Sequence, residues 1–336
     1  MVRLGGRPVL ERLTAPMTTR VAILDDYQRV ALRHGPWDDL GPDVQVVPFH
    51  DHVAGDDELV ARLAGFDVVV AMRERTPFAR ARLERLPDLR LLVTTGSANA
   101  SIDVAAAGAL GITVCGTRIG TASTAELTWA LILAVTRHVC VEDRAVRSGG
   151  WQHTIGPELE SRTLGVIGLG RQGRRVAAVG RAFGMELLAW SQNLRPEQAR
   201  EHGAEHAGSL EGLLGRADVV TVHLRLSDRT RGLIGAAELA AMKPTAYLVN
   251  TSRGPIVDEA ALLAALEAGT IAGAGLDVFD TEPLPPGHPL RSTPNTVLTP
   301  HIGYVATANY DRFYGDAVED VAAWRRGAPV RVVEPV

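Results

Sequence analysis

The chain has little cysteine, few aromatic residues and no uninterrupted apolar run of membrane-spanning length. Cys115 and Cys140 are the only cysteines in 336 residues, and they lack metal-ligand spacing. A disulfide framework and a structural zinc site are therefore not expected. We interpret both cysteines as buried free thiols in a reducing compartment and predict a cytoplasmic protein. No apolar stretch is long enough to span a bilayer, so we expect no membrane partner. Because the chain shows no metal-ligand spacing, we also expect no bound metal.

The chain also lacks a strong excess of either charge. It carries 35 basic and 39 acidic residues, a formal net charge of −4, which gives no reason to expect nucleic acid as a partner. Hydrophobic residues make up 46% and charged residues 22%, as in globular proteins. A length of 336 residues suits two domains rather than one.

The N-terminal segment is predicted to be a disordered leader, residues 1–19. It has no sustained apolar stretch, so a signal peptide is not expected. Met17 lies just before the first strand-like segment, and the sequence leaves open whether translation starts at Met1 or Met17.

Strand-like and helix-like segments alternate through most of the chain, which is typical of parallel α/β sheets. In the first third, the predicted strands are Val21–Leu24, Val44–Pro48, Val68–Ala71, Leu91–Thr94 and Ile112–Cys115, and the predicted helices are Asp57–Leu63, Arg80–Leu86 and Val104–Ala109.

A long and mostly apolar segment, Ser123–Arg147, has no internal proline or glycine and is predicted to form one helix. A second alternating series follows it and ends in a helix predicted over Thr307–Trp324. The strands predicted in this series are Leu164–Gly168, Leu187–Trp190, Val219–His223, Ala246–Asn250, Ala274–Asp277 and Thr296–Leu298.

The glycines Gly168, Gly170 and Gly173 fit the G-x-G-x-x-G pattern of dinucleotide-binding turns. They follow a predicted strand and precede a predicted helix (Arg174–Phe183), the context that this pattern requires. Glycines there permit a tight turn, and the helix N-terminus stabilises pyrophosphate charge. We therefore predict a bound dinucleotide, although such a turn also occurs as a purely structural element.

The cofactor's identity depends on the end of the second strand of this unit. An acidic residue there normally binds the ribose 2′-hydroxyl of NAD. Here Ser191, Asn193 and Arg195 follow the strand, with no acid among them. This favours NADP slightly over NAD, but a solvated turn that leaves NAD held by its hydroxyls is the alternative.

Three short segments near the C-terminus each carry one residue suited to acid–base or anion-binding chemistry: Arg253, Glu282 and His301. Reversible oxidation of a 2-hydroxy acid needs a cation for the carboxylate, a base for the hydroxyl proton and a carboxylate to orient that base.

These motifs, in this order, resemble those of the D-isomer-specific 2-hydroxyacid dehydrogenase family over roughly residues 21–335. The resemblance rests on Thr163–Arg171, Asn250–Gly254, Asp277–Phe279 with Glu282-Pro283, and Pro300–Gly303. It implies an α/β fold of two Rossmann-like doubly wound parallel-sheet domains with the active site in the cleft between them, and a homodimer whose contact involves the helix after Ser123. The domains expected from it are a discontinuous substrate domain, residues 20–118 plus 305–336, and a dinucleotide-binding domain, residues 119–304.

The resemblance also implies roles for single residues. Arg253 would bind the substrate carboxylate, His301 would be the general acid/base, and Glu282 would favour its charged imidazolium form. Backbone N–H groups at Ser97 and Ala98 would hold the carboxylate too. Besides the three glycines, the candidate cofactor residues are Arg171, Gln172, Ser191, Thr251, Asp277 (for the nicotinamide carboxamide) and Thr124.

The substrate expected from the resemblance is a small 2-keto acid such as glyoxylate or hydroxypyruvate. Arg225 and Tyr304 stand where the family commonly has proline and a small residue, which leaves substrate size open. A dinucleotide-sensing corepressor of the same fold remains an alternative, because such relatives keep the same three catalytic residues. A methyltransferase that uses the glycine turn for another nucleotide would not explain those three residues together.

Overall fold

The computed structural model of the protein describes residues 18–335. The predicted leader falls almost wholly outside the described residues, and so does the choice between Met1 and Met17. The described chain divides into two compact units: a first unit of residues 18–120 and 307–335, and a second unit, Thr121–Ala306.

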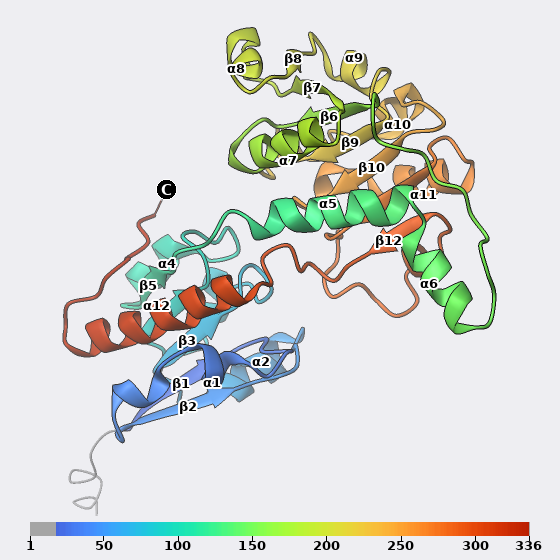
Figure 1. Ribbon diagram of the computed structural model, residues 1–336. Helices are drawn as coiled ribbons and strands as arrows, with labels where there is room; N and C mark the ends of the chain where they lie inside the picture. Colours follow the sequence, from blue (N-terminus) through green and yellow to red (C-terminus); the bar gives the residue numbers. More distant parts are fainter. Residues whose placement is uncertain (1–17, 336) are drawn as a thin grey trace, which may run out of the picture. The chain divides into compact units, whose positions relative to one another are not determined.

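The first unit contains a five-stranded parallel sheet with strand order β2-β1-β3-β4-β5 (Figure 1). Its five predicted strands are confirmed to within one or two residues, and α3 is shorter than predicted. The elements are β1 (Thr19–Ile23), α1 (Ala31–His34), η2 (Trp37–Leu40), β2 (Val44–Pro48), α2 (Asp56–Leu63), β3 (Val68–Ala71), α3 (Arg80–Leu83), β4 (Leu91–Thr94), α4 (Val104–Ala109), β5 (Thr113–Gly116) and α12 (Thr307–Arg325).

The second unit contains a seven-stranded parallel sheet with strand order β12-β11-β10-β9-β6-β7-β8. Its strands are β6 (Thr163–Ile167), β7 (Glu186–Trp190), β8 (Glu205–His206), β9 (Val219–Val222), β10 (Tyr247–Asn250), β11 (Gly273–Leu276) and β12 (Thr296–Leu298). Its helices are α5 (Ser123–Thr136), α6 (Val139–Arg147), α7 (Arg171–Ala182), α8 (Pro196–Glu201), α9 (Leu210–Leu214), α10 (Ala236–Ala241), η3 (Gly254–Ile256), α11 (Glu259–Glu267) and η4 (Pro289–Arg291).

The α/β prediction with two parallel sheets is therefore confirmed. Only the two-residue strand β8 was not predicted. In the second unit the chain moves outward in opposite directions from β6, to β7 on one side and to β9 on the other. The carboxyl ends of the strands at such a switch point form the usual ligand crevice of open α/β sheets.

The prediction of one helix over Ser123–Arg147 was wrong. The chain breaks between α5 and α6, where His138 adopts a left-handed conformation (φ 52°) and the helix axes bend by 64° (Figure 1). Half of α5 is buried against β10, β11 and α7, whereas α6 has no buried residue. The change in burial therefore explains the bend: the chain leaves the core at Thr136.

Within residues 18–335, no single helix is long and apolar enough to cross a membrane. The bent pair α5–α6 reaches that length and composition only when its two helices are counted together.

The two cysteines are free, but the prediction that both are buried holds only for Cys115. Cys140 lies on α6 and is exposed, because that helix buries none of its residues.

The C-terminal segment is tied to α12 by an ion pair in the core of the first unit. Nη2 of Arg331 lies 2.9 Å from Oδ1 of Asp320, whose side chain is fully buried. Next to it, Val332 pairs with Cys115 at the edge of the sheet. Burial of the Asp320 carboxyl outweighs its ion pair with Arg331 and raises the pKa of Asp320 to about 7.

Asp320 should therefore make stability depend on pH. A raised carboxyl pKa stabilises the fold while the group is protonated, and this contribution is lost as pH rises through about 7. We expect Asp320→Asn to remove that dependence, so its stability relative to wild type should rise by about 2 kcal/mol between pH 5 and pH 8.5. Urea unfolding at both pH values measures this, and a pH-independent difference would contradict it.

Candidate active site

The glycine turn joins β6 to α7 at the centre of the second unit's sheet. Gly168 has a left-handed φ of 98°, and a Cβ there would lie 2.7 Å from the carbonyl oxygen of His223. A Cβ on Gly173 would overlap the carbonyl oxygen of Gly168. In contrast, a Cβ on Gly170 would meet no atom within 4 Å.

These three environments match what a dinucleotide requires. The first glycine makes the turn, the third lets the helix pack against it, and the second leaves space for a close approach to the backbone. The 12-residue helix α7 starts at Arg171 with no side-chain cap, so its first N–H groups remain available for an anion. The turn therefore fits the pyrophosphate of NAD or NADP.

The residues predicted to select the cofactor follow the neighbouring strand. β7 pairs with β6 so that Trp190 lies opposite Ile167, and Ser191 comes next at the carboxyl edge. Asn193 and Arg195 are exposed, as is Arg171. An oxygen atom of the Gln172 amide is buried and has no hydrogen-bond partner within residues 18–335. The side chain of Gln172 is thus poised for an additional polar contact.

The turn that carries Arg253 is fixed by its own side chains. The Asn250 amide donates to the carbonyl of Arg253 (2.9 Å) and accepts the N–H of Ser252 (3.0 Å). Ser252 Oγ donates to the carbonyl of Val222 at the end of β9. A Cβ on Gly254 would overlap the backbone of Phe279, so glycine allows the Arg253 turn to pack against the segment after β11.

That packed segment leads to the acid–base pair. Glu282 uses one oxygen to accept the N–H of Phe279 (3.0 Å) and the other to bond Nδ1 of His301 (2.5 Å). Both side chains are mostly shielded, at 26% and 16% exposure. A carboxylate on Nδ1 fixes the imidazole tautomer and directs Nε2 away as the proton-transfer atom. The predicted pairing of Glu282 with His301 is thus present in the structure.

Asp277 organises the segment that carries His301. Its fully buried carboxylate accepts Thr299 Oγ1 (2.6 Å), the N–H of Ile302 (2.8 Å) and the N–H of Gly303 (2.8 Å). Burial raises the pKa of this carboxyl, and these donors oppose the shift. The sequence interpretation gave Asp277 a nicotinamide contact, but this internal role was not expected.

The two threonine candidates are also bonded within the second unit. Thr124 Oγ1 donates to the carbonyl of Gly303 (3.0 Å), and Thr251 Oγ1 lies 2.9 Å from Thr128 Oγ1. Thr124 therefore connects α5 to the segment that carries His301, and Thr251 connects the Arg253 turn to α5. Both threonines thus stabilise the backbone beside the site.

Comparison with known proteins gives this site its context. Residues 129–303 match the family described as D-isomer specific 2-hydroxyacid dehydrogenase, NAD binding domain. This chain belongs to that family. It is 45% identical to a glyoxylate reductase of Aeropyrum pernix over 255 residues, which cover 73% of this chain and 76% of the relative. It is 38% identical to a glyoxylate reductase of Korarchaeum cryptofilum over 276 residues, covering 80% and 82%.

A solved structure supports the same family assignment. The chain superimposes on a putative D-3-phosphoglycerate dehydrogenase oxidoreductase from Ralstonia solanacearum with a TM-score of 0.89, at 38% identity, covering 94% of this chain and 97% of that one. As a member of the family, the protein is an NAD(P)-dependent oxidoreductase that acts on the CH–OH group of 2-hydroxy acids. The family resemblance seen in the sequence is confirmed.

In this dehydrogenase, the loop predicted to bind the substrate carboxylate lies after β4 in the first unit. Gly96 has φ 103° and donates its N–H to Thr117 Oγ1 (2.7 Å). Ser97 and Ala98 follow and are exposed. Within residues 18–335, no group accepts their backbone N–H groups, so both are available to an anion.

The turn after β3 carries the charged residues Arg73, Glu74 and Arg75, and the side chain of Arg73 is largely shielded. Nη1 of Arg73 donates to the carbonyl of Thr95 (2.9 Å), its backbone N–H donates to Thr95 Oγ1, and its side chain is only 15% exposed. The Asn99 amide donates to the carbonyl of Arg73 (2.6 Å). Arg73 is thus hydrogen-bonded to the loop that carries Ser97.

Other histidines of the dehydrogenase have structural partners. His52 is bonded to the buried Asp25 (2.9 Å) and is largely shielded. His206 bonds the carbonyl of Leu194 (3.0 Å). Desolvation lowers the pKa of His223 to about 4, which keeps it neutral beside the glycine turn. No group of three His, Cys, Asp or Glu suited to a metal occurs in the described part of the chain.

Proposed function

We propose that the protein reduces small 2-keto acids, glyoxylate or hydroxypyruvate, to the corresponding D-2-hydroxy acids. The observation that carries this proposal is the shielded His301–Glu282 pair, at 2.5 Å, beside the Arg253 turn in a unit that has a dinucleotide-type glycine turn. The names of the relatives support the substrate class: two are glyoxylate reductases and another is a glycerate dehydrogenase.

The roles follow from the chemistry of each group. The guanidinium of Arg253 binds the substrate carboxylate and polarises the keto oxygen, a bidentate task that suits its planar fork. The N–H groups of Ser97 and Ala98 bind the same carboxylate. When bound, the reduced nicotinamide supplies the hydride to C2. His301, protonated and held by Glu282, gives its Nε2 proton to the keto oxygen, so hydride and proton together yield the hydroxyl group.

In this proposal the first unit is the substrate domain and the second unit is the dinucleotide-binding domain. The two free cysteines suit the reducing conditions of the cytoplasm, where we propose that the enzyme works.

Turnover by the purified protein tests the proposal. NADPH and NADH oxidation would be followed with glyoxylate, hydroxypyruvate, pyruvate and phenylpyruvate. We expect turnover with at least one of the first two. Tight dinucleotide binding without any turnover would reject the reductase and support a sensing role.

We further propose that NADP(H) is preferred over NAD(H). Support comes from the exposed Arg195 and Arg171 on the turns after β7 and β6, and from Ser191 where an acid would repel a 2′-phosphate.

Arg195→Gln should therefore weaken NADPH binding about tenfold, the loss expected for one charge-assisted hydrogen bond, and leave NADH binding unchanged. Titration of intrinsic fluorescence gives both dissociation constants. Arg200→Gln is the matched control, because Arg200 is an exposed arginine on the adjoining helix α8 that pairs with Glu197. An equal loss for both cofactors would contradict a 2′-phosphate contact.

The enzyme is also proposed to be a homodimer through the face formed by α6 and the segment after it. This face exposes Val139 (51%), Val146 (53%), Trp151 (74%) and Ile155 (97%), and clustered exposed apolar residues mark interfaces. The Glu142 carboxylate accepts the N–H of Thr154 (2.7 Å), which pins that segment beside α6.

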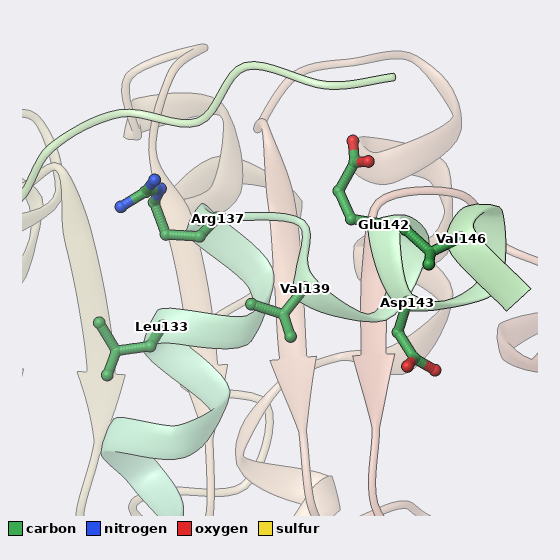
Figure 2. Close-up of a pocket in the computed structure, with 6 residues that line it drawn as sticks. All are labelled: Leu133, Arg137, Val139, Glu142, Asp143 and Val146. Atoms are coloured by element: carbon green, nitrogen blue, oxygen red, sulfur yellow. The ribbon is translucent and has the colours of Figure 1, made fainter. Parts of the chain in front are cut away.

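A surface cavity of about 590 Å³ opens at the α5–α6 junction on this face. Figure 2 shows the side chains around it, apolar ones from both helices with charged ones between them. It is lined by Leu133, Arg137, Val139, Glu142, Asp143 and Val146.

A charge in the middle of this face should separate the subunits. Val146→Glu is expected to halve the mass measured by sedimentation equilibrium at micromolar concentration, because a buried unpaired carboxylate is costly. Leu32→Glu is the control, since Leu32 is equally exposed (52%) but lies on α1 in the first unit. A wild-type protein that sediments as a monomer would reject the interface.

A further inference from the structure

Tyr304 packs against the proposed acid–base histidine. It lies three residues after His301, is only 5% exposed, and its ring centroid is 5.7 Å from that of the imidazole at an interplanar angle of 74°. This is an edge-to-face arrangement of two rings.

The hydrogen bonds at His301 fix one ring atom and the neighbouring backbone. Glu282 bonds one atom of the imidazole, Nδ1. The N–H groups of Ile302 and Gly303, both bonded to Asp277, fix the backbone beside it. A single hydrogen bond restrains the position of Nδ1 but allows the ring plane to rock about that point. A ring packed at a steep angle against the imidazole restrains its plane, and hence the direction in which Nε2 points.

We propose that Tyr304 is a positioning residue for His301: its aromatic ring holds the imidazole plane while Glu282 holds Nδ1, so that Nε2 stays aligned with the substrate oxygen. This inference rests on the proposed catalytic role of His301.

The ring, rather than the bulk alone, is what the proposal needs. Tyr304→Phe keeps the ring and should retain kcat within about threefold of wild type. Tyr304→Leu removes the ring and should lower kcat for glyoxylate reduction by about 10²-fold, the loss that a misplacement near 1 Å produces. It should also shift the acid–base limbs of the pH profile of kcat/KM, while the dissociation constant for the dinucleotide stays unchanged.

Tyr247→Leu is the matched control. Tyr247 is a buried tyrosine (6% exposed) at the start of β10 in the same unit. Its replacement should lower the melting temperature but leave the pH profile in place. If Tyr304→Leu does not fold, as judged by circular dichroism, Tyr304→Met fills the same space without an aromatic ring and is measured instead.

Two results would overturn the inference: wild-type kcat and pH profile in the folded Leu or Met variant, or a loss in Tyr304→Phe as large as in Tyr304→Leu. Failure of the proposed function looks different, because the wild-type protein would then turn over neither glyoxylate nor hydroxypyruvate. Failure of the proposed role of His301 would appear as turnover retained in His301→Ala. If His301→Ala is inactive and the Tyr304 variants are normal, only the positioning role is rejected.

Discussion

His301→Ala should lower kcat for 2-keto acid reduction by about 10²–10⁴-fold, the usual contribution of a positioned general acid. The Nε2 proton is the only one that the Glu282-bound imidazole directs away from its carboxylate partner. Without it, the keto oxygen must take a proton from water as hydride arrives. Stopped-flow measurement of NADPH oxidation in a single turnover gives the rate of this step. Dinucleotide binding should be unchanged, since the glycine turn lies on other segments of the unit.

The chain offers a close control for this variant. His288 bonds Glu259 at 2.9 Å, and its side chain is 16% exposed, the same as that of His301. His288→Ala should therefore remove a similar His–Glu pair from the same unit without affecting turnover. Glu282→Gln should keep part of the activity but shift the pH profile, because a neutral amide replaces the carboxylate that bonds Nδ1 of the imidazole. Equal activities in the His301 and His288 variants would remove His301 from the mechanism.

Much of the fold could be predicted because its signals are local. Buried parallel strands appear as short apolar runs, and β2, β3, β4 and β12 have the bounds that their sequences predicted. The glycine turn was equally clear, since Gly168 and Gly173 must be glycine for steric reasons alone. The His301–Glu282 pair was predicted from short motifs in the sequence, and the two side chains are bonded in the structure.

What the sequence did not predict depends on contacts between distant segments. The run after Ser123 has no helix breaker, yet the helix ends at Thr136 because the apolar surface available to α5 ends there. Cys140 is exposed for the same reason. The three donors to Asp277 come from residues more than 20 positions away, so its part in shaping the His301 segment was not evident from the motif.

Arg253→Ala should mainly weaken substrate binding and raise KM for glyoxylate about 10²-fold or more. A bidentate guanidinium contact supplies two charge-assisted hydrogen bonds of about 1.5–3 kcal/mol each, and about 1.4 kcal/mol corresponds to a factor of ten. The turn itself should survive, because Asn250 holds its backbone and Gly254 permits its packing against Phe279. Steady-state kinetics with glyoxylate, at saturating NADPH, separate KM from kcat.

Two further variants make the test specific to guanidinium geometry. Arg253→Lys keeps the charge but loses the planar fork, so it should recover only part of the lost affinity. Arg231→Ala removes an exposed arginine from the same unit and should leave KM unchanged. If Arg253→Ala instead lowered kcat at constant KM, Arg253 would act on the transition state without holding the carboxylate of the bound substrate. The carboxylate would then be held by the N–H groups of Ser97 and Ala98, the remaining donors of the proposed site.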